Sequence, residues 1–499
     1  MNCPRCEIKN PDGAQICGSC GQVLKSDTSE RPAAKPKTSR LAIASFIISF
    51  LGLPLFFLAG IPSIILGIIA IFEVSRSRGK LKGTTFAIAG IVISLFLMSV
   101  FFLWSLDAPP IPNDYTIADL RSAPPEYAET FELLKTLNKK EPNVPLESAI
   151  GLSEEDDKLL KQISNVISEG SPSEISEVLK INKDNIEKAW SKTEKAREII
   201  SKLNTFNEIA DMTEPNVNFD VVDVSNTIKL ARFYQAYIYL KIQQGNPQTM
   251  LKYLIEFDSV IRKFSLNARP LIIKLICFIC LTTSIETANA IINDPRTPQE
   301  IVELIAKHFT PLTKEHLSLR NSILVEYLTM KYISTMESFK YVTVYNPMLK
   351  KNSTLRLYRN LCDHWIYILE GLQKSKSEEL SVWPRHFPNC LHVSIDSDVR
   401  LPWFYKCYNP IGSVLTRLLK ASFRLSDKIT EIKIQDDLLQ IVLNKRLGKE
   451  INLKARAYSE EYIVDLENKK IFSPGPDGIP HTKDDIKLMI NPEVLNFKK

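Results

Sequence analysis

Four of the nine cysteines lie in the first twenty residues, in two pairs that each enclose two residues. The pairs are Cys3 with Cys6 and Cys17 with Cys20. In the later pair each cysteine is followed by a glycine, Gly18 or Gly21. Four thiolates at this spacing can surround one Zn²⁺ tetrahedrally, at about 2.3 Å for each Zn–S bond. The segment has few apolar side chains, so a bound metal would replace a hydrophobic core. We therefore expect a structural zinc site in residues 1–22.

Two other uses of these cysteines are a disulfide pair and a redox-active Cys-x-x-Cys motif. Redox motifs usually accompany a βαβ pattern, which the surrounding sequence lacks. A catalytic zinc keeps one coordination position open for water, whereas four thiolates fill every position. The segment resembles the short zinc ribbons at the N-termini of many bacterial membrane proteins, through the motifs CPRC and CGSCG.

A second group with metal-binding chemistry lies near the C-terminus. Asp477, Asp484 and Asp485 share one loop with two glycines. Carboxylate and carbonyl oxygens are the ligands that Ca²⁺ prefers, so one interpretation is a calcium site. The alternative is a tight turn held by Asx hydrogen bonds, without an ion. The run GPDG…TKDDI resembles the terminal loop of type II secretion pseudopilins, and that resemblance implies Ca²⁺.

The remaining cysteines have simpler interpretations. Cys277 and Cys280 lie in an apolar run and are expected to be small buried side chains rather than a redox pair. Cys390 and Cys407 bracket a segment rich in proline and aromatic residues. A disulfide between them is permitted if this part of the chain lies outside the cytoplasm. Cys362 is then left without a partner.

Two apolar segments, 41–72 and 84–104, carry no charged side chain. Both reach the length of about twenty residues that a helix needs to cross a bilayer. The linker 23–40 is basic and polar, and we expect it to be disordered because it cannot bury enough apolar surface. Ion pathways usually need an ionisable group inside the membrane, so an anchor is favoured over a channel or transporter.

The charge distribution predicts the topology of this region. Basic side chains flank 41–72 on both sides, in the linker 23–40 and in the loop 73–83. Basic flanks mark the cytoplasmic side, so both ends of 41–72 should be cytoplasmic. Glycines and prolines in the middle of the segment can break it into a hairpin or re-entrant loop. Residues 84–104 then cross once, outward. The alternative is one long span through 41–72, which places the basic loop outside and the large domain in the cytoplasm.

The small-residue pattern of this region resembles a known family. The stretches LAIAS from Leu41, ILGIIA from Ile65, GKLKG from Gly79 and AIAGI from Ala87 look like the bacterial membrane domain of unknown function 4190. The resemblance covers about 40–104 and implies a membrane domain, with no activity attached. The small residues would also allow close helix packing in lipid.

Residues 115–345 carry helical periodicity and are expected to form a helical array. Ser153 and the acids after it predict an N-cap, and Gly170 can end that helix. Further helices are expected at 184–203, 228–244, 249–264, 271–282, 300–308 and 314–338. The pair around Gly245 is similar to tetratricopeptide hairpins, although no clean repeat is visible. The run 271–282 is short for a span and contains Lys274, so we expect a buried helix.

Residues 346–499 are expected to form an α+β region. Helices are predicted at 355–372 and 413–445, and 461–486 should contain a β-hairpin that turns at Asn468 and leads into the acidic loop. The expected fold class is therefore a multidomain membrane protein. It combines a four-cysteine zinc ribbon, a transmembrane helical region and a mainly α-helical extramembrane domain with a small C-terminal β-hairpin.

Two function classes follow from these observations. The first is a membrane-anchored binding or scaffold protein of the bacterial envelope, with a cytoplasmic ribbon and a periplasmic helical domain that binds a protein partner. The second is a membrane-bound enzyme with a dispersed active site, or a component of a secretion assembly. The motifs of zinc hydrolases, α/β-hydrolases and phosphate loops are not found, which favours the first class. The net charge of +6 is modest, and no basic–aromatic stripe indicates nucleic acid.

Overall fold

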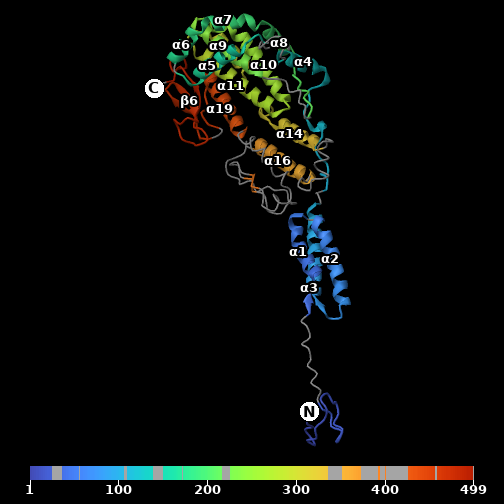
Figure 1. Ribbon diagram of the computed structural model, residues 1–499. Helices are drawn as coiled ribbons and strands as arrows, with labels where there is room; N and C mark the ends of the chain where they lie inside the picture. Colours follow the sequence, from blue (N-terminus) through green and yellow to red (C-terminus); the bar gives the residue numbers. More distant parts are fainter. Residues whose placement is uncertain are drawn as a thin grey trace. The chain divides into compact units, whose positions relative to one another are not determined.

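A computed structural model describes residues 1–24, 36–55, 57–105, 109–138, 150–170, 172–215, 225–334, 351–371, 392–393, 399–400, 425–455 and 458–497. The chain divides into two compact units, Met1–Leu106 and Asp107–Lys499. The first unit contains the cysteine-rich segment and three apolar helices. The second contains the remaining helices and a small sheet (Figure 1).

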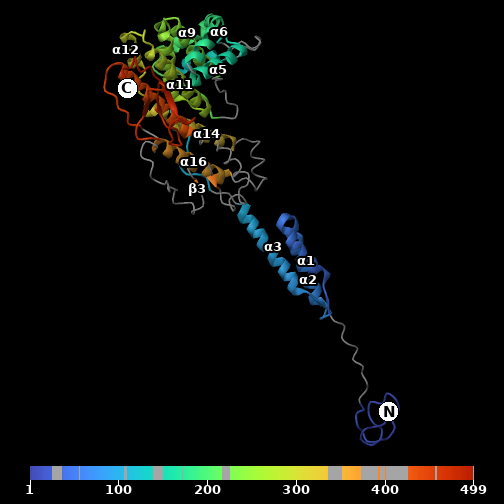
Figure 2. The same ribbon diagram turned by 90° about the vertical axis from the view of Figure 1, so that its left-hand side faces the viewer.

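Three helices account for the apolar region, and both views draw them side by side (Figures 1 and 2). Their bounds are α1 Arg40–Leu55, α2 Phe57–Arg76 and α3 Thr84–Ser105. Each of the three packs along the other two. The segment 41–72 is therefore divided between two helices that form a hairpin. At 22 residues, α3 has the length that a span requires.

Reciprocal hydrogen bonds define how α1 and α2 pair. The Ser45 hydroxyl donates to the Ser63 carbonyl and the Ser63 hydroxyl donates to the Ser45 carbonyl, each over 2.8 Å. The strand β1 (Lys37–Thr38) runs parallel to β2 (Leu81–Lys82), immediately before α1 and α3. The helices α1 and α3 thus begin at the same end of the bundle, where α2 finishes. The basic side chains next to the helices gather at this end: Lys37, Arg40, Arg76, Arg78, Lys80 and Lys82.

The bundle buries small residues and exposes large apolar ones. Ala42, Ala70 and Ala87 are fully buried at its centre. A Cβ atom at Gly90 would lie 3.0 Å from the Ser45 carbonyl carbon, so α1 and α3 touch at the backbone. The outward side chains are more than a third exposed: Ile43, Ile47, Phe50, Ile61, Ile65, Ile68, Ile69, Phe72, Phe86, Ile88, Val92, Leu95, Phe96, Val100 and Phe102.

The second unit is mainly helical. After two 3₁₀ turns, η1 Ile117–Asp119 and η2 Pro125–Tyr127, its first helices are α4 Ala128–Asn138, α5 Glu154–Glu169, α6 Pro172–Ile181, α7 Lys183–Lys192, α8 Glu194–Thr205 and α9 Ser225–Gln243. The 3₁₀ turn η3 Pro247–Met250 precedes α10 Leu251–Asn267, α11 Leu271–Asn293, α12 Gln299–His308, α13 Lys314–Leu317, α14 Arg320–Ile333, α16 Lys351–Gly371 and α19 Leu425–Arg446.

The helix α11 lies at the centre of this unit. It packs against α9, α10 and α19, and most of its side chains are buried. The sequence predicts a buried helix at 271–282, and the observed helix continues eleven residues further, to Asn293. A helix that is apolar on all sides is either a core helix or a membrane span. The neighbours on several sides of α11 are those of a core helix. Both α9 and α10 pack more extensively on α11 than on each other, unlike a self-contained helical hairpin.

The sequence predicts the ends of a helix correctly where it contains capping residues. The Ser153 hydroxyl accepts from the Asp156 backbone N–H at 3.1 Å, while the Asp156 carboxylate accepts from the Ser153 N–H at 2.8 Å. This capping box starts α5, and Gly170 follows its last residue. The prediction of one helix over 184–203 is wrong, because Thr193 separates α7 from α8. The prediction of one helix over 314–338 is also wrong, since Ser318 and Leu319 separate α13 from α14.

A three-stranded antiparallel sheet lies near the C-terminus, in the order β5 (Ile463–Asp465), β6 (Lys470–Ser473), β7 (Ile486–Met489). The first two strands form the predicted hairpin, and the Asp465 carboxylate accepts from the Asn468 N–H at 2.9 Å in its turn. The third strand extends the predicted hairpin beyond the acidic loop. This sheet packs against α19. A further short antiparallel pair joins β3 (His392–Val393) to β4 (Val399–Arg400).

Candidate metal centre

Two similar hairpins build the cysteine-rich segment. Asn2 pairs with Lys9, and Ile16 pairs with Val23, so each hairpin encloses one cysteine pair. Each chain reversal passes through a residue of positive φ, Glu7 at 58° in the first hairpin and Gly21 at 68° in the second. Glycine adopts this conformation without steric cost, whereas a glutamate there is less usual.

The hairpins bring the four sulfurs together. All four Sγ atoms lie within 4.8 Å of one another. The Cys3–Cys20 and Cys6–Cys17 sulfurs are each 3.6 Å apart. A tetrahedral ZnS₄ site with bonds of about 2.3 Å has sulfur–sulfur distances of about 3.8 Å. The four cysteines could therefore hold one metal ion with little movement.

A second layer of hydrogen bonds supports the sulfurs. The Asn10 amide donates to the Cys17 Sγ at 3.4 Å and to the Ile8 carbonyl at 2.9 Å, while its oxygen accepts from the Gly18 N–H. Backbone N–H groups of Cys20 and Ser19, and then this amide, lower the pKa of Cys17 to about 6. A lowered pKa favours the thiolate, which is the form that binds metal.

The remaining thiols show why a cation is needed. The Ile8 backbone lowers the pKa of Cys6, but the neighbouring thiols and burial outweigh it and raise the pKa to about 12. Four negative sulfurs at these distances repel one another, so some stay protonated until a cation compensates their charge.

The aspartates of the C-terminal loop are engaged in hydrogen bonds within that loop. Asp477 accepts from the Ile479 N–H at 2.8 Å, an Asx turn. Asp484 accepts from the Thr482 hydroxyl at 2.6 Å, and a Cβ atom on Gly475 would clash with Asp484. Within the described ranges, the group of metal-ligating side chains close enough to share an ion is the four cysteines. The calcium site stays a prediction.

Asp485 differs from the other two loop aspartates. Its side chain is only 3% exposed and lies 3.5 Å from the Lys470 ammonium. One carboxylate oxygen accepts from the His481 N–H at 3.0 Å, and the other is buried without a hydrogen-bond partner. One buried carboxylate oxygen of Asp485 therefore receives no hydrogen bond from the loop.

The other cysteines are distributed as follows. Cys277 and Cys280 are buried in α11, where burial raises the pKa of both thiols. Cys362 is buried in α16, and burial raises its pKa as well. Such thiols are inert packing groups. Cys390 and Cys407, between which the sequence permits a disulfide, lie outside the described residues.

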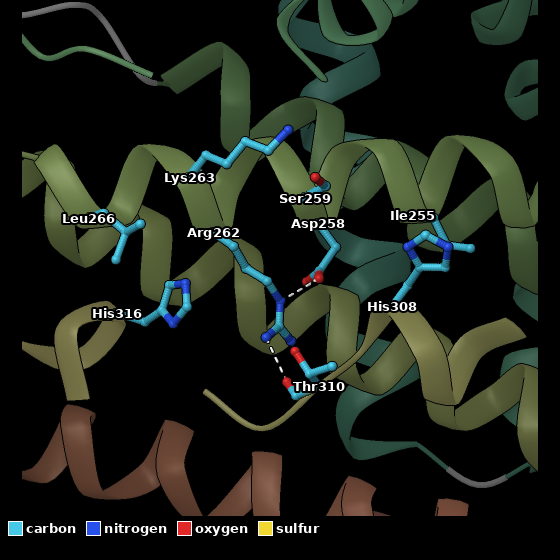
Figure 3. A pocket seen from close by; sticks show the side chains of 9 residues that line it. All are labelled: Ile255, Asp258, Ser259, Arg262, Lys263, Leu266, His308, Thr310 and His316. Carbon is cyan, nitrogen blue, oxygen red and sulfur yellow. Dashed lines mark hydrogen bonds and ion pairs between the residues drawn. The ribbon is translucent and has the colours of Figure 1, made fainter. Parts of the chain in front are cut away.

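One polar site is not predicted from the sequence. Asp258 and Arg262 form a buried ion pair on α10, with 2.6 Å between the Arg262 Nε and an Asp258 carboxylate oxygen. They line a pocket of about 240 Å³ together with His308, the last residue of α12, and His316, which lies in α13 (Figure 3). The signal in the sequence is an acid and an arginine four residues apart on a largely apolar helix, but the partners across the pocket are distant in sequence.

The comparison with known families supports one resemblance. The family described as a domain of unknown function (DUF4190) matches residues 41–104, which are the helices α1, α2 and α3 with the loop between the last two. The resemblance inferred from the small-residue motifs is thereby confirmed for this segment. No curated protein matches the chain. No solved structure matches it either.

Length and composition identify one described helix that could cross a membrane, α11 at Leu271–Asn293. However, 61% of its most apolar window is buried within the protein. Shorter apolar stretches of α1 and α3, Arg40–Phe50 and Thr84–Val100, accompany it. This finding is consistent with membrane association.

Proposed function

We propose that this chain is a membrane-anchored binding or scaffold protein. In this proposal α1, α2 and α3 are the anchor, the cysteine-rich segment is a structural zinc ribbon in the cytoplasm, and residues 107–499 form an extracytoplasmic helical domain that binds a protein partner. The observation that carries the proposal is the packing of the three-helix bundle.

The bundle has the distribution of side chains that suits lipid. Its centre holds alanine, glycine and serine, and its surface holds isoleucine and phenylalanine. In water a large contiguous apolar surface is unfavourable, whereas lipid tails solvate it well. Helices in lipid associate through small residues and interhelical hydrogen bonds, as in the Ser45–Ser63 pair. The bundle is therefore favoured over α11 as the membrane region.

The basic end of the bundle supports the proposed orientation. The cations at the start of α1, the end of α2 and the start of α3 all belong to this end, and cytoplasmic flanks are enriched in lysine and arginine. The chain leaves α3 at the other end of the bundle. Residues 107–499 would then lie outside the cytoplasm, and the cysteine-rich segment inside it.

The cysteine centre supports a structural role for the ion. Four thiolates complete a tetrahedral shell, so no position is left for a substrate or water. Zinc is the natural candidate because it accepts a tetrahedral shell of thiolates and has no redox chemistry in proteins. A ribbon of this kind is a small rigid module that can contact a cytoplasmic partner.

Three experiments test the proposal. An alkaline phosphatase fusion after Asp119 should be active, and a fusion within Arg76–Lys82 should be inactive; the opposite result would reject the orientation. For the binding function, native membranes are extracted in mild detergent, and the full chain is compared with a chain that ends at Ser105. A stoichiometric protein retained only by the full chain supports a scaffold role. Full recovery of the chain in an alkaline carbonate wash would contradict the anchor.

A further inference from the structure

The pocket on α10 has a buried donor and a buried acceptor that the protein does not satisfy. The Arg262 Nε and Nη1 atoms donate to Asp258 and to the Thr310 carbonyl, the latter over 2.7 Å. The other terminal nitrogen, Nη2, is buried and has no partner, and neither has the second oxygen of Asp258. The Arg262 and Asp258 side chains are only 9% and 3% exposed. Buried polar atoms are normally hydrogen-bonded, so both atoms indicate a missing partner.

Hydrogen-bond donors predominate around this pair. Figure 3 shows His308 and His316 on opposite sides of Arg262, with Ser259 and Lys263 on the same helix as the ion pair. The His316 Nδ1 atom accepts from the Thr313 backbone N–H at 3.1 Å, which places the proton of the neutral ring on Nε2. The ring is therefore a donor on its other side.

Both cationic and anionic side chains surround the pocket. Burial and then the charges of Arg262 and Lys274 lower the pKa of His316 to about 4. The Lys263 ammonium donates to the Asn204 carbonyl at 2.8 Å, and this residue also lines the pocket. The charges of Arg262 and Lys263 are opposed by Asp258 and by the buried Asp436, which interacts electrostatically with both Arg262 and Asp258. A bound anion would therefore be held by the unpartnered hydrogen-bond donor rather than by an excess of positive charge.

We propose that this pocket binds a phosphate group that carries a proton. The unpartnered nitrogen of Arg262 and the donors around it would bind phosphate oxygens, and the P–OH group would donate to the unpartnered oxygen of Asp258. Arginine suits phosphate because its planar group presents several N–H donors. A volume of about 240 Å³ admits inorganic phosphate or the phosphate end of a small metabolite. Sulfate has no proton at neutral pH, so it would meet the Asp258 carboxylate without a hydrogen bond.

The test uses the full chain in mild detergent and phosphate-free buffer, with isothermal titration of sodium phosphate and of sodium sulfate. We expect saturable binding of one phosphate per chain and at least about tenfold weaker binding of sulfate. Glycerol 3-phosphate is a third arm. Tighter binding of this ester than of phosphate would identify a metabolite as the source of the group, and weaker binding would identify free phosphate.

Three variants complete the test. Arg262→Lys keeps a positive charge but removes the unpartnered nitrogen, and should weaken phosphate binding by at least about tenfold. Asp258→Asn preserves the shape of the side chain and adds an N–H donor, so sulfate should bind about as well as phosphate. Lys252→Gln, at an exposed position of α10, should change neither the affinity for phosphate nor the affinity for sulfate. Absence of saturable phosphate binding, or equal binding of both anions by the unaltered chain, would overturn the proposal. If Arg262→Lys does not fold, Asp258→Asn alone decides it, because unchanged discrimination would also overturn it.

Discussion

The Tyr327 hydroxyl donates a 2.7 Å hydrogen bond to the carboxylate of Asp114, a residue 213 positions earlier in the chain. The same carboxylate lies 2.8 Å from the Lys331 ammonium and 3.3 Å from the Arg359 guanidinium. Arg359 also donates to the Asn113 carbonyl at 3.1 Å. Hydrogen bonds and ion pairs therefore attach the segment that opens the second unit to α14 and α16.

Removing the Tyr327 hydroxyl should loosen this attachment. We expect Tyr327→Phe to lower the free energy of unfolding by about 2 kcal/mol, because hydrogen bonds to charged groups contribute more than neutral ones. Denaturant unfolding of the full chain in detergent measures the change. The control is Tyr234→Phe, since the Tyr234 hydroxyl is buried without a partner and its removal should cost little. Equal losses in both variants would contradict the assigned role.

The Asp114 attachment should also depend on pH. Burial raises the pKa of Asp114, but hydrogen bonds from Lys331 and Tyr327 outweigh it, so the pKa lies below its usual value of 3.8. A lowered pKa in the folded state contributes stability above the unfolded value, and this is lost as pH falls through the folded pKa. We expect the unaltered chain to lose stability below about pH 4 more steeply than Asp114→Asn. Parallel pH profiles of the two proteins would argue against the ion cluster.

The metal centre predicts one zinc ion per chain. Cys17→Ser should abolish stoichiometric zinc, as measured by elemental analysis under reducing conditions at neutral pH. Asn10→Ala should retain the ion but weaken its affinity by about 10–100-fold, the usual effect of losing a residue that supports a ligand. Ser19→Ala is the control, because that side chain is exposed and its backbone N–H remains. Finding no zinc in the unaltered chain would refute the zinc ribbon.

The helix bundle predicts different effects for two of its glycines. Gly90→Ala brings a Cβ atom within 3.0 Å of the α1 backbone at Ser45, and overpacking of this kind costs about 1–3 kcal/mol. Gly60→Ala meets only the flexible Met98 side chain, at 3.1 Å, and should be tolerated. Thermal unfolding in detergent should therefore show a lower midpoint for Gly90→Ala alone. Equal midpoints would mean that α1 and α3 are not packed at the backbone.

Two hypotheses for the C-terminal loop, a calcium site and a turn without an ion, predict different responses to Ca²⁺. If Asp477, Asp484 and Asp485 bind Ca²⁺, the ion should raise the unfolding temperature, because a ligand that binds only the folded state stabilises it. Asp484→Ala and Asp485→Ala should remove this gain, whereas Glu467→Gln, exposed in the neighbouring turn, should keep it. Equal unfolding temperatures in calcium and in chelator would leave the Asx turn of Asp477 as the full explanation.

Most of the features that could be predicted from the sequence depend on residues close together in the chain. The spacing of Cys3, Cys6, Cys17 and Cys20 predicts their convergence because each pair lies on one short turn, and only two hairpins need to meet. Ser153 and Gly170 predict the ends of α5 because caps act within one helical turn. The small-residue motifs of 41–104 likewise indicate the family resemblance from the sequence alone, and the family model matches the same residues.

Contacts between distant segments were decided only by the tertiary structure. Thr193 looks like any residue inside an amphipathic helix, yet it separates α7, which packs on α9, from α8, which packs on α10 and α4. The strand β7 is too short to be recognised by itself, and β6 supplies its hydrogen bonds. Arg262 forms an ion pair with Asp258, which is near in sequence, but it also donates a hydrogen bond to the Thr310 carbonyl, 48 residues away. Propensity acts over a few residues, whereas burial and hydrogen bonding depend on which surfaces the whole chain brings together.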